Sequence, residues 1–381
     1  MIHSAKRTIT FLISIIVFFI LSYILFYHQA SSTGESFPSD MYCYVDYING
    51  QESDLISYPL FFWFAKIISL LTSAEIAVAI ALSILNSLTV IFLYIFFQRQ
   101  VDKKQSLVII VVPFALCFIS PLYFPAFNPY LYLGQWSPNP WQNATTLAMR
   151  PFAILAYYFF LESWSHLHQK IEKKNILFFS LSLFLSTLTK PTFAFVFLPA
   201  AGICIIFDFF KNRCAFLKNT LFIGLSVLPT ILLLLKQYLL TFQQSSSAEG
   251  ISISPGTAWG HYSPNILVSI ILACAFPLSI FFAYLKHPRL TYHKVFSLSY
   301  GMLFIGILEA IFLNEKGLRQ FHGNFIWPYI IALFFSFTAS IPLWYHMKKS
   351  WYKSICSLLL FLHIITGLIY FIRIFGGYPY N

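Results

Sequence analysis

The first 26 residues, MIHSAKRTITFLISIIVFFILSYILF (1–26), decide the class of fold. A basic start at Lys6 and Arg7 precedes an apolar run close to the roughly 20 residues that a helix needs to cross a bilayer. A secretory signal peptide has a shorter apolar region and ends at a small-residue cleavage motif, which does not follow this run. We therefore expect an uncleaved transmembrane helix at 8–27.

The rest of the chain has the same apolar character. Of its 381 residues, 58% are hydrophobic and 10% are charged, with a mean hydropathy of +0.73. Soluble proteins carry about 25% charged residues, so we expect an all-α polytopic membrane protein. The net charge of +11 would also suit nucleic-acid binding, but in so apolar a chain it is better explained by the positive-inside rule. We expect no nucleic-acid partner.

The apolar runs predict eleven transmembrane helices with the N-terminus in the cytoplasm. Most of the 24 Lys and Arg residues fall in alternate loops, which become cytoplasmic in this orientation. The other loops, at 28–73, 127–146, 240–263 and 314–324, then lie outside. The predicted spans are 8–27, 74–97, 106–126, 147–163, 176–189, 192–210, 218–239, 264–285, 295–313, 325–344 and 352–372.

One further apolar run, YPLFFWFAKIISLL (58–71), is too short to span comfortably. A crossing here would reverse the charge bias of every later loop. We expect a helix that lies in the outer interface, with Trp63 and Lys66 at headgroup level. Residues 28–73 then form the first extracytoplasmic loop of a single transmembrane domain, with no separate soluble domain.

The predicted first outer loop is acidic although the protein is basic. Its segment SDMYCYVDYINGQESDLISYP (39–59) holds four carboxylates and no Lys or Arg. Glu52 and Asp54 precede the interfacial helix, where acids stabilise a helix N-terminus. Asp40, and after it Asp46, are therefore the candidate general bases. The segment contains no D-x-D pair, so it does not predict a dedicated metal site. A carboxylate such as Asp40 could still bind a divalent cation weakly.

Basic residues at the predicted outer surface oppose the positive-inside rule and suggest a function beyond helix-end snorkelling. Lys190 lies in STLTKPTFAF (186–195), where Pro191 breaks the helix and fixes the lysine between two spans. Cations at such a surface can hold the phosphate of a lipid. The candidate phosphate ligands are Lys190, Arg150, Arg319 and His322.

Two outer loops add candidate substrate-binding residues. LGQWSPNPWQNATTLAM (133–149) presents Trp136 and Trp141, and tryptophan rings commonly stack on sugars. LNEKGLRQFHGNFIW (313–327) contains Asn324 beside Arg319 and His322. Glu309 lies inside the ninth predicted span, where an ionisable residue is a functional candidate by default, with pairing to a nearby cation as the structural alternative.

These features resemble the GT-C superfamily of membrane glycosyltransferases, which use polyprenyl-phosphate-linked sugars. Relatives of protein O-mannosyltransferases have an essential acid early in the first outer loop, similar to Asp40 in PSDMYCYVDYI (38–48). They often have a Tyr-Pro step into an interfacial helix and a Lys-Pro hairpin, similar to Tyr58-Pro59 and to TKPT at 189–192.

The resemblance implies that Asp40 activates the acceptor, that Lys190 contacts the donor phosphate and that Tyr58 lies at the substrate. Where the mannosyltransferase branch often has a second adjacent acid, this chain has Met41, so Asp40 and Asp46 stay as alternatives.

The sequence thus predicts a glycosyltransferase that moves a sugar from a polyprenyl phosphate to a glycan, lipid or protein acceptor on the extracytoplasmic face. An O-antigen-type polysaccharide polymerase or ligase is one alternative, and a lipid-linked sugar flippase or transporter is another. Lys outnumbers Arg, which is typical of an AT-rich genome, so we expect a bacterial plasma membrane.

Overall fold

The computed structural model describes residues 2–32, 36–51, 57–101, 106–211, 216–242, 250–286 and 293–379. Within these ranges the chain is almost entirely helical, with two three-residue strands. Nine helical segments there are long and apolar enough to cross a membrane. They are α1 (Ile2–Ser31), α4 (Ala74–Gln100), α6 (Ala144–Ser165), α8 (Thr192–Lys211), the consecutive α9 (Leu217–Ser226) and α10 (Leu228–Phe242), α12 (Ile266–Lys286), α13 (His293–Phe312), α14 (Trp327–His346) and α15 (Trp351–Phe375).

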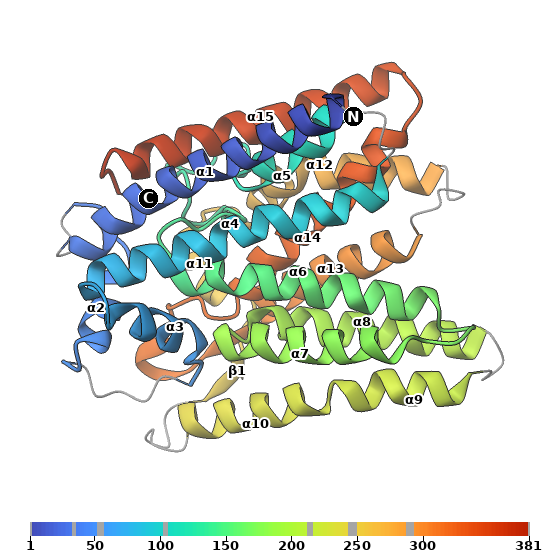
Figure 1. Cartoon of the computed structure of the whole chain (residues 1–381), viewed down its shortest axis with the longest axis horizontal. Helices are drawn as coiled ribbons and strands as arrows, with labels where there is room; N and C mark the ends of the chain where they lie inside the picture. Colours follow the sequence, from blue (N-terminus) through green and yellow to red (C-terminus); the bar gives the residue numbers. More distant parts are fainter. Residues whose placement is uncertain are drawn as a thin grey trace.

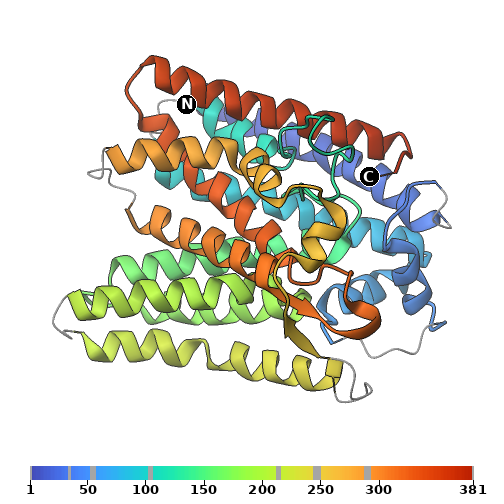
Figure 2. The ribbon, with the colours of Figure 1, turned by 180° about the vertical axis from the view of Figure 1, so that it is seen from behind.

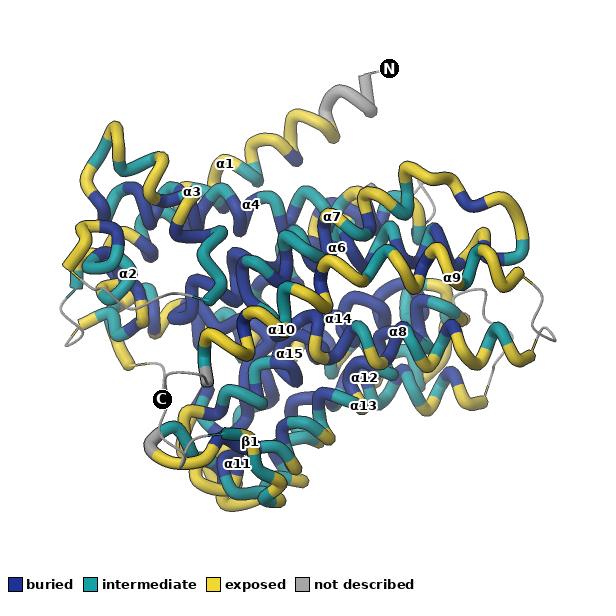
Figure 3. Tube along the Cα trace, turned by 90° about the horizontal axis from the view of Figure 1, so that it is seen from below, coloured by how far each residue is buried: buried dark blue, intermediate teal, exposed yellow. Residues whose placement is uncertain are grey.

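The helices run roughly along one direction and surround α14 (Figures 1 and 3). Nearly every residue of α14 is buried, as expected for a helix that is apolar on all sides. Its hydroxyl groups bond to its own backbone, for example Ser336 Oγ to the Leu333 carbonyl at 2.7 Å. By contrast, α9, α10 and the first half of α1 expose large apolar side chains, which suits helices whose outer faces meet lipid.

Two of the eleven predicted spans are shorter helices in the structure. The span predicted at 176–189 is α7 (Lys173–Thr189), which has 17 residues. The span predicted at 106–126 begins as α5 (Ser106–Leu116) and continues without regular secondary structure. We expected a helix because hydropathy alone does not distinguish a spanning helix from a buried irregular segment.

The two ends of the irregular segment 117–143 are buried, and neighbouring helices bond to the backbone of its first part. The Ser120 N–H donates to the His363 carbonyl at 3.1 Å, and His363 Nδ1 lies 2.7 Å from the Ser120 carbonyl oxygen. The Leu122 N–H donates to the carbonyl of Leu272 on α12 at 3.1 Å. Irregular backbone at membrane depth is tolerated only in such a protein-lined setting.

One end of the bundle, here called the loop end, carries the small elements (left in Figure 1). It holds α2 (Met41–Ile48), α3 (Leu60–Ser69), α11 (Thr257–Tyr262) and the antiparallel strands β1 (Ile251–Ile253) and β2 (Leu313–Glu315), followed by a 3₁₀ turn at Gly317–Arg319. Figure 2 shows β1 and the chain around β2 side by side. The run predicted as an interfacial helix at 58–71 contains α3, which buries Phe61 and Phe62 and exposes Trp63.

The opposite end, here called the basic end, gathers the basic helix termini (right in Figure 1). Arg99, Lys211 and Lys286 lie in the last turns of α4, α8 and α12. Lys173 and Lys353 lie in the first turns of α7 and α15. These basic residues therefore lie toward one end of the bundle axis.

Candidate functional site

Asp40, Asn143 and Lys190 meet at the loop end although they are far apart in the sequence. The Asn143 amide joins the other two, because its Nδ2 donates to Asp40 Oδ2 at 2.7 Å and its Oδ1 accepts from Lys190 Nζ at 2.8 Å. Lys190 Nζ also donates to Thr146 Oγ1 at 2.8 Å and lies 4.1 Å from the centre of the Trp327 ring. The acid and the cation are thus fixed relative to each other through one side chain.

The ends of helices place these three groups. Asn143 is the N-cap of α6 and accepts the Thr146 N–H at 3.1 Å, as an asparagine at that position commonly does. Lys190 ends α7 in extended backbone, immediately before Pro191, as the sequence predicted. Asp40 precedes α2, but its carboxylate makes no cap bond there and is bound by Asn143 instead.

The surroundings disfavour the charged forms of the acid and the cation. Burial of the carboxylate raises the pKa of Asp40, and Lys190 and the Asn143 bond oppose this shift. Burial lowers the pKa of Lys190 to about 7, and the Asp40 charge opposes it. Asp40 is nevertheless exposed as a residue, whereas Lys190 is 7% exposed. The Asp40 residue therefore lies at the surface of the bundle with its carboxylate largely covered, while the Lys190 ammonium is enclosed.

Glu315, Arg319 and Asn324 form the second part of the site. Arg319 Nε lies 3.2 Å from Glu315 Oε2, and Asn324 Nδ2 donates to the same oxygen at 2.7 Å. Strand pairing holds this group in place, because Glu315 lies opposite Ile251 across β2 and β1. Glu315 is buried and orients the partly exposed guanidinium of Arg319.

Tyr58 lies between the two parts of the site. Burial raises the pKa of its phenol, Asp40 and Glu315 raise it further, and Arg319 opposes them. Tyr44 of α2 is subject to the same effect, because burial and Asp40 raise the pKa of its phenol. Both tyrosines therefore stay protonated and present O–H donors near Asp40.

A cavity of about 260 Å³ opens beside these groups. Lys190, Arg319, Asn324, Tyr58 and Trp327 line it together. Its other wall is less polar and comes from α8 and α10, namely Phe195, Leu234, Gln237, Tyr238 and Thr241. The cavity thus combines two cations with a side wall made from helices whose outer faces are apolar.

Arg150, which we predicted as a phosphate ligand, lies inside the bundle instead. It is 1% exposed, its Nη1 donates to Asn139 Oδ1 at 2.8 Å, and its Nη2 donates to the Pro138 carbonyl. Its guanidinium also lies 4.6 Å from the centre of the Phe334 ring. These contacts tie α6 to the irregular segment, and Arg150 does not line the cavity.

Trp136 and Trp141 are also interior residues, with exposures of 6% and 1%. The Trp141 ring packs against Phe118 and Phe371, at centroid distances of 5.6 and 4.7 Å. Neither ring presents a free face for a sugar. They pack inside because the Pro-rich loop that carries them is folded into the bundle.

Four other predicted residues, Asp40 among them, lie outside the cavity lining. Asp46 is a half-buried residue of α2, and His322 is exposed after the 3₁₀ turn. Glu309 is a half-buried residue of α13, with Oε2 enclosed and without a hydrogen-bond partner within the described ranges. Glu52 and Asp54 fall outside the described residues.

The sequence did not identify Asn143, Tyr44 or Trp327 as site residues. Asn143 carried a signal, because an asparagine just before an apolar helix is a typical N-cap. Nothing in the sequence pairs it with residues 40 and 190, since that contact depends on how α2, α6 and α7 pack. Trp327 was recognised only as an aromatic residue near the outer end of a span.

Among the described residues, no group of three or more His, Cys, Asp or Glu side chains is arranged to hold a metal ion. The chemistry available at the loop end comes from the Asp40 carboxylate, which Asn143 binds, and from a cavity lined by two cations and several hydrogen-bond donors. Comparison of the chain with protein-family models, with curated proteins and with solved structures gives no match.

Proposed function

We propose that the protein is a membrane glycosyltransferase of the GT-C type, which moves a sugar from a polyprenyl-phosphate donor to an acceptor on the extracytoplasmic face. The observation that carries this proposal is that Asn143 binds both Asp40 and Lys190, and that Lys190 lines a cavity together with Arg319. A base linked through one side chain to a cavity that two cations line suits transfer from a sugar phosphate.

In this proposal Asp40 is the general base. Its carboxylate takes the proton of the acceptor hydroxyl as the acceptor oxygen attacks the anomeric carbon of the sugar. The raised pKa of Asp40 makes the carboxylate a stronger base than an ordinary aspartate. The position of Asp40 at the surface of the bundle supports this role, because an acceptor of any size must reach it from outside the bundle.

The bond that breaks joins the anomeric carbon to an oxygen of the lipid phosphate, which leaves with the electron pair. Lys190 and Arg319 then stabilise the negative charge that gathers on the phosphate. Asn143, Thr146 and Glu315 hold these cations in position before the reaction starts. Such fixed charges do not need to reorganise as the reaction proceeds.

The wall formed by α8 and α10 supports a lipid-linked donor rather than a soluble sugar nucleotide. Phe195 and Tyr238 line the cavity and are also 38% and 50% exposed on the outside of the bundle. A donor whose phosphate binds Lys190 can therefore extend its chain past these side chains into the membrane.

Glycan and lipid-linked sugar profiles of cells test the proposal. The cells carry the wild type, a deletion, Asp40→Asn or Asp46→Asn, each variant at matched expression. We expect Asp40→Asn to lose the same sugar as the deletion, because removing a general base slows transfer by about 10²- to 10⁴-fold. Asp46→Asn should retain it. Loss in Asp46→Asn alone moves the base to Asp46, and a deletion that changes no glycan and no lipid-linked sugar refutes the transferase.

A further inference from the structure

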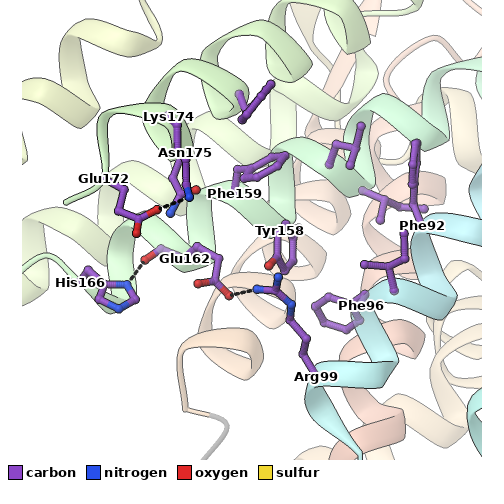
Figure 4. A pocket seen from close by; sticks show the side chains of 14 residues that line it. Phe92, Phe96, Arg99, Tyr158, Phe159, Glu162, His166, Glu172, Lys174 and Asn175 are labelled. Atoms are coloured by element: carbon purple, nitrogen blue, oxygen red, sulfur yellow. Dashed lines mark hydrogen bonds and ion pairs between the residues drawn. The ribbon is translucent and has the colours of Figure 1, made fainter.

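A second cavity lies at the basic end, between α4, α6 and α7 (Figure 4). Its volume of about 510 Å³ falls within the range of roughly 300 to 1,000 Å³ typical of small-molecule sites. The proposed transfer reaction does not use this cavity, because none of its lining residues also lines the cavity at Lys190.

The body of this cavity is an aromatic groove. Phe92, Phe96, Tyr158, Phe159 and Phe178 line it, with Ile95, Ile154 and Leu155. Phe178 and Ile95 are also 47% and 42% exposed, so the groove opens onto the apolar flank of the bundle. An acyl chain that enters the groove from the side would cover these aromatic and aliphatic side chains and exclude water from them.

The mouth of the groove carries two acid–base pairs. Arg99 Nη1 lies 3.2 Å from Glu162 Oε1, and the guanidinium lies 4.8 Å from the centre of the Tyr158 ring. Lys174 Nζ lies 3.1 Å from Glu172 Oε2. Figure 4 shows both pairs at one side of the groove, to the left of and below the aromatic side chains.

We propose that this cavity binds one phospholipid whose headgroup has a phosphate and a primary ammonium, with an acyl chain in the aromatic groove. The mouth contains equal numbers of cationic and anionic side chains, which matches a zwitterion. Arg99 and Lys174 have further N–H donors for the phosphate, and the carboxylates of Glu162 and Glu172 have further lone pairs for the ammonium.

The same chemistry sets the order of preference among headgroups. A quaternary ammonium has no N–H to donate to the carboxylates, so it loses those hydrogen bonds. An anionic headgroup leaves both carboxylates without a cationic partner in the ligand. We therefore expect phosphatidylethanolamine to bind better than phosphatidylcholine or phosphatidylglycerol with the same acyl chains.

Native mass spectrometry of the purified full-length protein tests this order. The protein in detergent is mixed with equal amounts of the three lipids, and the retained one-to-one adducts are compared. One charge-assisted hydrogen bond corresponds to about a tenfold preference for the ethanolamine lipid. The double variant Glu162→Gln/Glu172→Gln should lose this preference, whereas Glu75→Gln, at the other end of α4, should keep it.

Folding of the double variant can be checked by its melting temperature, which should change little because ion pairs this exposed contribute little to stability. Leu155→Trp provides a second, independent test, since it narrows the groove and should reduce adducts of all three lipids. Equal retention of the three lipids by the wild type overturns the proposal. An ethanolamine preference that survives in the double variant also overturns it.

Discussion

Asp40 and Lys190 are each held where the uncharged form is favoured, and this predicts how the proposed activity depends on pH. The base works only when deprotonated, so activity should fall as pH drops through the raised pKa of Asp40. The phosphate ligand works only when protonated, so activity should also fall as pH rises through the lowered pKa of Lys190, about 7. Sugar-transfer rates measured across this range should give a bell-shaped profile.

Lys190→Arg separates the two limbs of that profile. A guanidinium stays protonated at any pH of interest, so the alkaline limb should disappear while the acid limb from Asp40 remains. An alkaline limb that is unchanged in Lys190→Arg would assign it to another group.

At the residue scale, the sequence predicted the chemical groups better than their arrangement. Lys190 was identified because Pro191 fixes its backbone, which is a local rule. Asp40 was identified as an acid in an acidic loop, and its contact with Asn143 was not foreseen. That contact is non-local, since it depends on how α2 and α6 pack. Arg150 was misplaced for the same reason, because an arginine near a predicted helix end can point either outward or into the bundle.

At the element scale, the third predicted span shows the limit of hydropathy. Segment 117–143 is apolar enough to suggest a helix in its first ten residues, yet it is irregular. Its prolines at 121, 125, 129, 138 and 140 were the available signal, because each lacks a backbone donor and disfavours helix before it. The ends of α4 and α7 were predicted better, since polar or Pro-containing sequence bounds them.

Gly367 of α15 is required by this irregular segment. A Cβ atom at that position would lie 1.3 Å from the Phe118 carbonyl oxygen. Gly367→Ala should therefore force the two backbones apart and lower stability by about 2 to 4 kcal/mol. Thermal unfolding of the detergent-purified protein measures the change.

Gly202→Ala, on α8, is the matched control, because a Cβ atom at that position would have no neighbouring atom within 4 Å. It should be neutral or stabilise slightly, since alanine favours helix over glycine by up to about 1 kcal/mol. Equal effects of the two substitutions would mean that α15 and segment 117–143 do not approach as closely as described.

At the scale of the whole molecule, the two ends of the bundle differ in charge and in shape. Most of the basic helix termini lie at one end, and the irregular elements with the candidate site lie at the other (Figure 1). The sequence predicted such a division because most Lys and Arg residues fall in alternate predicted loops. With the proposed function, the positive-inside rule predicts that the basic end lies in the cytoplasm and the proposed site outside.

Labelling with a membrane-impermeant thiol reagent tests this orientation. Gln51, at the loop end, and Gln169, at the basic end, are both exposed, and each is replaced by cysteine in a background without the six native cysteines. The Gln51→Cys protein should react in intact cells, whereas Gln169→Cys should react only after permeabilisation. The reverse pattern would place Asp40 and Lys190 in the cytoplasm, where a donor sugar on the outer leaflet does not reach them. Reaction of both in intact cells would mean that an odd number of crossings does not separate residues 51 and 169, and the short helix α5 with the irregular segment after it would then need a different placement in the bilayer.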